Sequence, residues 1–160
     1  MNGLEKIAVT ISAALADNII KQGHNDTGAL VKSIEHNITT SGTRTTIEIL
    51  FNDYGTFVNY GRAAGKYVPF SILFDWVKRR LNLSGLQARS ATFAINRKIF
   101  KEGIPTSGAK KFSKNGKRTG FITDAITDTE KTIEAEIADY YEKVISTKFE
   151  TVTKVGKYQF

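Results

Sequence analysis

A long amphipathic stretch near the end of the chain constrains the possible fold more than any other feature. Apolar residues recur at helical spacing across about residues 123–149, and this period predicts the longest helix of the fold. The residues that carry the pattern are Ile126, Ile133, Ile137, Tyr140, Tyr141, Val144 and Ile145. In the segment that follows, 150–160, Val152, Val155 and Tyr158 alternate loosely with polar residues. That segment is expected to form an edge strand or a tail.

The first fifty residues predict two helices and a hairpin. A helical pattern at about 4–22 ends at Gly23, and Asp26 or Thr27 is expected to cap a short second helix.

The hairpin is expected to have strands at about 36–40 and 44–51, joined by a turn at 41–43. The second strand alternates between two sets of residues: Ile47, Ile49 and Phe51 on one face, and Glu48 and Leu50 on the other. A period of two implies that one face of the hairpin is buried.

The middle of the chain predicts short helices and a loop. Residues 54–60 are expected to form one or two helical turns with Phe57, Val58 and Tyr60 facing inward. A proline opens the next helix, at about 69–81, where its missing N–H is not needed.

A further helix at about 86–101 is expected to begin at a capping box formed by residues 84–87. Gly103 and Pro105 are expected to close that helix. The segment 106–120 is rich in Lys, Ser and Gly and has no periodicity. It therefore predicts an exposed, mobile, basic loop.

The formal net charge of +7 is distributed very unevenly. Residues 61–120 contain fourteen Lys or Arg and two acids, a net charge of +12, so the other hundred residues sum to −5. Residues 121–150 alone carry −5. Such asymmetry indicates a charged partner or pairing between the two zones. The basic zone could bind nucleic acid, meet an acidic protein surface or only raise solubility.

The sequence contains no convincing catalytic or metal-binding set. There is no cysteine, and His24 and His36 lack the spacing of a zinc site. Both histidines are therefore expected to be solvated, and no metal or cofactor is expected. The acids of the last helix are expected to form its solvated face. A metal-dependent nuclease would need Asp53 and Asp75 to meet one of those acids. No apolar run approaches the length of a membrane span.

Five large aromatic residues lie within twenty positions, namely Phe57, Tyr60, Phe70, Phe74 and Trp76. They are expected to belong to the core or, alternatively, to a subunit interface, because aromatic side chains anchor such contacts.

Three ordered motifs resemble the tail-completion and head–tail joining (neck) proteins of tailed bacteriophages. The first is D-T-G-A-L at 26–30, the second is F-V-N-Y-G at 57–61, followed by Pro69-Phe70, and the third is F-I-T-D-A-I at 121–126. Asn59 stands where an acid is common in that family. The chain also departs from the compact members by inserting helices and a basic loop at about 70–120.

The resemblance implies an α+β fold, with a small, mainly antiparallel sheet, flanking helices and a long C-terminal helix, as one domain over 1–160. It also implies a structural virion protein with no catalytic role. Six or twelve copies would form a ring between portal and tail, made in the bacterial cytoplasm and located in the virion. Its partners would be the portal (connector) and tail proteins, and packaged DNA could pass through its lumen.

A closed ring needs two different patches on each subunit. The candidate interface residues are Phe57, Tyr60, Phe70, Trp76, Lys110, Lys111, Lys114, Lys117 and Arg118. The alternative is a small basic nucleic-acid-binding protein.

Overall fold

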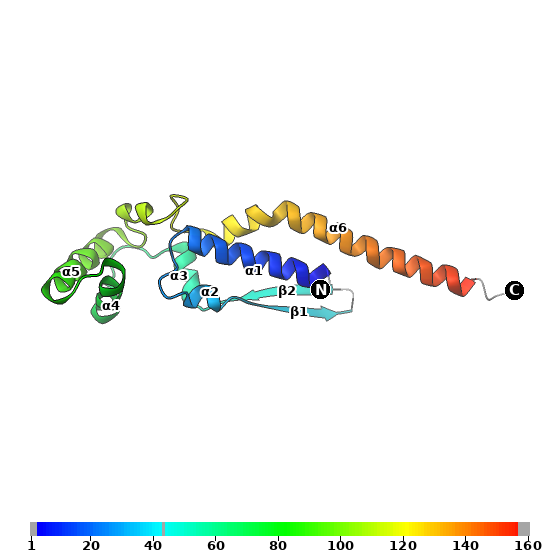
Figure 1. The fold of residues 1–160 in the computed structure, drawn as a ribbon, viewed down its shortest axis with the longest axis horizontal. Coiled ribbons are helices and arrows are strands. Elements are labelled where there is room, and N and C mark those ends of the chain that lie inside the picture. The colour runs from blue at the N-terminus through cyan, green and yellow to red at the C-terminus, as the bar shows by residue number, and fades with distance from the viewer. Residues whose placement is uncertain (1–2, 43, 157–160) are drawn as a thin grey trace.

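Helices and one two-stranded antiparallel sheet make up an elongated α+β fold in the part of the chain that the structure describes (Figure 1). The computed structural model describes residues 3–42 and 44–156, with side chains as far as residue 151. The elements are α1 (Gly3–Lys21), α2 (Ala29–Lys32), β1 (Glu35–Ser41), β2 (Arg44–Leu50), α3 (Tyr54–Tyr60), α4 (Phe70–Leu81), α5 (Gly85–Glu102), the 3-10 helix η1 (Ser107–Phe112) and α6 (Phe121–Gly156). The expected fold class is confirmed.

Helix α1 lies between α6 and the strand hairpin, and it contacts both (Figure 1). The buried core forms where these elements meet α2, and it consists of Leu15, Ile19, Leu30, Phe121 and Ala125. The ring of Phe51, at the end of β2, meets the Phe121 ring edge-on with centroids 5.9 Å apart. The helical period of α1 and of the start of α6 thus serves one shared apolar core.

The hairpin follows the expected pattern closely. Its strands pair in antiparallel register from Glu35 opposite Leu50 to Ser41 opposite Arg44. Alternate side chains of β2 are half-buried, whereas Leu50 is 53% exposed. The period of two in the sequence therefore correctly identified the face that packs toward α1. Thr43, in the expected turn, lies outside the described residues.

Helices α4 and α5 form a separate hairpin at one end of the molecule (Figure 1). The Phe70 ring lies 4.9 Å from that of Phe93 across the two helices. The side chain of Asn96 is buried and exchanges two hydrogen bonds with the backbone of Val68, through Oδ1 (2.9 Å) and Nδ2 (2.8 Å). These contacts hold α4 and α5 against the segment that leads into them.

Polar contacts join this helical hairpin to the rest of the fold. The backbones of Arg62 and Ile104 exchange hydrogen bonds of 2.7 and 2.8 Å. Asp26 forms an ion pair with Arg79 (2.8 Å) and lies 3.7 Å from Arg80. Asp26 therefore does not cap α2. The N-cap residue is Gly28, and the Thr27 hydroxyl accepts a bond of 3.3 Å from the Ala29 N–H.

Helix α6 continues well past the N-terminal end of α1 (Figure 1). At 36 residues it is about 54 Å long, whereas the 19 residues of α1 span about 28 Å. The start of α1 lies beside Tyr140, because a Cβ added at Gly3 would meet the Tyr140 ring. The residues of α6 from 141 to 151 are all exposed.

The expectation of an edge strand or a tail after residue 149 is wrong as far as residue 156, because α6 continues to Gly156. The stretch 121–155 contains neither Gly nor Pro, so nothing stops the helix earlier. Residues 157–160 lie outside the described part.

The expected capping box at 84–87 does not form either. Ser84 makes no side-chain bond to the helix, whose first residue, Gly85, has a φ of +53°. The first turn therefore lacks a side-chain cap, and the Ser84 carbonyl accepts a helical bond from the Ala88 N–H (3.2 Å). The other expected helix boundaries agree with the structure within two residues.

Candidate partner-binding site

A pocket of about 550 Å³ opens between α3 and the backbone that joins it to α4. We call it the cationic pocket. Its lining is His24, Tyr54, Phe57, Val58, Gly61, Arg62, Lys66, Val68, Ile104 and Arg118. Every ionisable side chain that lines it, apart from the tyrosine, is basic, and the other side chains are apolar. This lining suits a ligand that combines an apolar body with a carboxylate or another anion.

The floor of the pocket depends on a glycine. Gly61 ends α3 with a φ of +78°, a conformation that favours glycine. A Cβ at this position would collide with the carbonyl oxygen of Ile104. Gly61 thus permits the close approach at which Arg62 and Ile104 pair. That pairing brings the segment before α4 and the segment after α5 to the same pocket.

Helix α3 points its large side chains outward, contrary to the sequence expectation. Phe57 is 64% exposed and Tyr60 is 77% exposed, while Val58 is half-buried. The inward positions belong to Gly55, packed against Phe51, and to buried Asn59. The small and polar residues of this turn therefore hold it to the body, and its aromatic residues remain at the surface.

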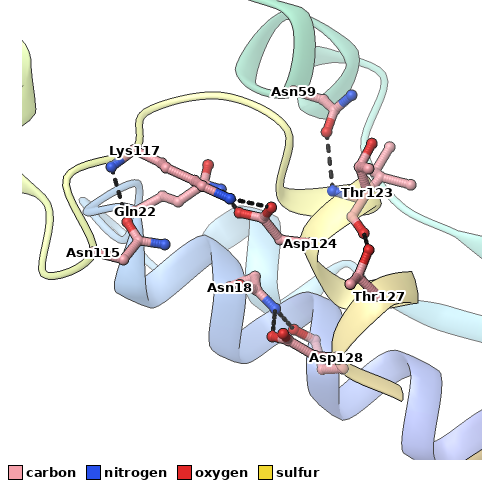
Figure 2. Close-up of polar contacts among 11 residues, drawn as sticks. Asn18, Gln22, Asn59, Asn115, Lys117, Thr123, Asp124, Thr127 and Asp128 are labelled. Carbon is pink, nitrogen blue, oxygen red and sulfur yellow. Dashed lines mark hydrogen bonds and ion pairs between the residues drawn. The ribbon is translucent and has the colours of Figure 1, made fainter. Parts of the chain in front are cut away.

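Asn59 links α3 to the start of α6 (Figure 2). Its side-chain oxygen accepts a hydrogen bond of 3.0 Å from the Ile122 N–H, and its carbonyl accepts one of 2.8 Å from Gly120. Two backbone N–H groups at the beginning of α6 thereby find partners. A carboxylate would accept the same bond and would also suit the positive end of the helix dipole.

His24 is half-buried beside the pocket and is not the solvated residue that the sequence predicted. Its Nε2 lies 3.0 Å from the carbonyl oxygen of Arg118, so Nε2 is the protonated nitrogen and donates. Burial, and secondly the positive charge of Arg118, lower the pKa of His24 to about 4. At neutral pH His24 therefore contributes a polar ring without a charge.

Arg118 supplies a positive charge that the fold does not neutralise. Its Nη1 donates to the carbonyl of Gln22 (2.7 Å), and its buried Nε has no hydrogen-bond partner among the described residues. Burial, and secondly the nearby charge of Arg80, lower the pKa of Arg118. Arg118, Arg62 and Lys66 form no ion pair with a carboxylate of the described residues. A bound anion would therefore compensate a charge that lacks a counterpart.

The expected basic loop at 106–120 is largely exposed, and its mobility stays a prediction. It contains η1, and it is tied to the end of α1, because the Lys114 N–H donates to the Lys21 carbonyl (2.7 Å). The bonds of Arg118 to Gln22 and His24 add to this attachment. A loop without sequence periodicity is thus attached to the body by hydrogen bonds to backbone carbonyls, which leave no signal in the sequence.

The basic residues of this loop have different surroundings. Lys110, Lys111 and Lys114 are exposed, and Lys111 lies over the ring of Phe112. Lys117 instead forms an ion pair of 2.7 Å with Asp124, which also accepts a bond of 3.1 Å from Gln22 (Figure 2).

The structure separates the residues that the sequence grouped as interface candidates. Phe57 and Arg118 both line the cationic pocket, and Tyr60 lies on the same short helix as Phe57. Phe70 and Trp76 are half-buried on α4. Four further residues that line the cationic pocket were not among the sequence candidates, namely Tyr54, His24, Arg62 and Lys66. The high glycine and basic content around residue 61 was their only signal.

The acids of α6 are not simply a solvated face. Asp128 accepts a bond of 3.1 Å from buried Asn18, and Glu136 forms an ion pair of 3.2 Å with Lys6 (Figure 2 shows the former). His36 likewise meets Glu5 at 3.0 Å and is not simply solvated. These bonds are polar links between α1 and its neighbours.

Among the described residues, no group of three or more His, Cys, Asp or Glu side chains is arranged to hold a metal ion. Asp75 lies 3.7 Å from Lys78, and neither Asp53 nor an acid of α6 joins it in such a group. No helix in the described ranges has both the length and the apolar character needed to cross a membrane.

Comparison with known proteins gave no match: no family model, no curated protein and no solved structure is significantly similar to this chain.

Proposed function

We propose that this chain is a structural subunit of a tailed-phage virion that forms a ring in the neck or at the top of the tail. In this proposal six or twelve copies join head to tail, contact the portal (connector) and tail proteins, and line or seal the channel through which DNA passes. The protein would act by contact and geometry, without turnover, cofactor or membrane.

The observation that carries the proposal is the surface around α3. Phe57 and Tyr60 are the most exposed aromatic residues of this region, and Phe57 lines the pocket together with cations that have no carboxylate partner among the described residues. Exposed aromatic residues with unpaired charges are typical of a surface that a partner covers. A subunit of a joining ring needs such a surface.

A second observation supports the resemblance on which the proposal rests. The three motifs lie far apart in the sequence, yet their residues meet at one place. Leu30 of the first motif and Phe121 of the third belong to the same buried cluster, and Asn59 of the second bonds to the third. Motifs that build one junction together are more specific than three independent short matches.

The proposal is tested in the phage that encodes the protein. Tyr60→Ala, or Lys110→Glu with Lys111→Glu, should block head–tail joining while separate heads and tails still accumulate. Electron microscopy of lysates and particle yield would measure this. Thr56→Ala, an exposed polar position on the same helix, is the matched control. Normal particle yields from both variants would contradict the proposal.

Nucleic-acid binding is the second candidate, and one observation favours it. Several exposed cations form no ion pair among the described residues, namely Arg89, Arg97, Lys101, Lys110, Lys111 and Lys114. A gel-shift titration at two salt concentrations would test it. Micromolar or tighter binding with a steep loss of affinity at the higher salt would support this function. Absence of binding at low salt would exclude it.

A further inference from the structure

The long helix carries a second face that the fold does not cover. Exposed residues follow one another along this face at steps of three or four. They are Ile126, Glu130, Glu134, Ile137, Tyr141 and Ile145. We call this the outer face of α6. Its four apolar residues are 56%, 41%, 52% and 52% exposed in that order. Such spacing places all six on one side of a helix.

Helix α1 packs against the opposite side. Ala125 and Thr129 are buried there, Glu136 meets Lys6, and Tyr140 lies beside Gly3. A helix that needed only α1 would be polar on its other side. The apolar residues of the outer face therefore indicate a second contact, outside the fold of one chain.

The outer face combines apolar and acidic residues. Glu130 and Glu134 form no ion pair with any described residue, and they lie one helical turn apart, just before Ile137. The cationic pocket combines the opposite charge with apolar residues: Arg62, Lys66 and Arg118 surround Phe57 and its neighbours. The two surfaces are thus complementary in charge and alike in apolar content.

The far part of the outer face cannot reach the pocket of its own molecule. Arg118 in the pocket precedes α6, whereas Ile137 and Ile145 lie 16 and 24 residues beyond Phe121, which is about 24 and 36 Å along a rigid helix. Figure 1 shows the far end of α6 pointing away from α3. The complementary pair is available only between two chains.

We propose that the outer face of α6 in one copy docks into the cationic pocket of a second copy. Glu130 and Glu134 pair with the cations of that pocket, and the apolar residues beyond them cover its exposed aromatic side chains. The contact joins two different surfaces, so it is heterologous and can continue from copy to copy. As the joint of a ring it rests on the proposed function, whereas the self-association that it predicts does not.

Two sets of substitutions separate the surfaces. The face variant carries Glu134→Lys and Ile137→Ser, and the pocket variant carries Phe57→Ser and Lys66→Glu. All four positions are exposed, so the variants should fold, and circular dichroism checks this. Asp139→Lys, at an exposed acid off the outer face, and Lys101→Glu, at an exposed cation outside the pocket lining, are matched controls.

Sedimentation and light scattering over a range of concentrations give the result. Wild type and both controls should form multiples of 17.7 kDa, and each variant alone should associate at least tenfold more weakly. An equimolar mixture of the two variants should form a dimer that does not grow further, because one intact face meets one intact pocket.

Three outcomes would overturn the docking: a wild-type chain that stays monomeric, variants that assemble like wild type, or a mixture that stays monomeric. If the first occurs while Tyr60→Ala still blocks head–tail joining, the docking fails and the proposed function stands. If the chain self-associates as described but particle yields are normal in both the Tyr60 variant and the Lys110/Lys111 variant, the docking stands and the proposed function fails.

Discussion

The two halves of α6 carry a similar apolar pattern and have opposite surroundings. In the first half, Phe121 and Ala125 are completely buried and Thr129 is nearly so. In the second half, no side chain from 141 to 151 is buried. The same helical period therefore predicts a core-facing helix in one case and a surface helix in the other. Periodicity identifies a helix and an apolar face, but it does not identify what covers that face.

The difference has an energetic consequence. Burial of apolar surface stabilises the first half, whereas the second half has exposed side chains from 141 to 151 and local pairs such as Asp139–Lys143 (2.7 Å). A helix this exposed would be marginal alone, and it continues because the packed half has already formed its first turns. The side of the first half that faces α1 serves the fold, whereas the outer face is exposed along both halves.

The largest effect should come from the packed half. Phe121→Ala removes a fully buried ring from the core cluster, and unfolding free energy should fall by about 3–5 kcal/mol. Urea denaturation followed by circular dichroism measures this. A loss below about 1 kcal/mol would show that the start of α6 is not part of the core.

A smaller loss is expected where α3 meets α6. Asn59→Ala leaves the Ile122 N–H without its partner, which should cost about 1–3 kcal/mol. Asn59→Asp retains an acceptor and should remain close to wild type. If the alanine and aspartate variants are equally unstable, the link acts through something other than this bond.

The stability of the fold should depend on pH through His24, which lies in the loop after α1 and bonds to the segment before α6. The pKa of His24 is about 4 in the fold and near 6.5 in an unfolded chain. Between these values the unfolded chain binds more protons, so stability should fall as pH falls through this window. Allowing for partial exposure, the change should be on the order of 1 kcal/mol. His24→Gln should remove this part of the slope; an unchanged slope would place its origin elsewhere.

The smallest effect on folding should come from the second half of α6. Ile145→Ala changes a residue that is 52% exposed, so unfolding free energy of the monomer should change by less than about 0.5 kcal/mol. Dilute protein, below any association, is the sample for this measurement. A loss as large as that of Phe121→Ala would mean that the second half of α6 packs against its own chain.

The sequence predicted most elements of the fold because their signals are local. Helical spacing placed α1, α4 and α5, and alternation placed β2 with its buried face. The orientation of α3 was not predictable, because the packing of Gly55 against Leu30 and the Asn59 bond to α6 decide it, and both join distant segments. The pocket was missed for the same reason: Arg62, Ile104 and Arg118 come together only through the fold.

The backbone pairing of Arg62 with Ile104 has a consequence for engineering. It brings the entry and the exit of the α4–α5 hairpin to hydrogen-bonding distance, so the intervening residues form a closed excursion from the body. A short turn could bridge the two positions without moving either one, and foreign helices could be grafted at the same two points. The α4–α5 hairpin is thus a unit that can be exchanged, and its removal would show which properties of the protein depend on the body alone.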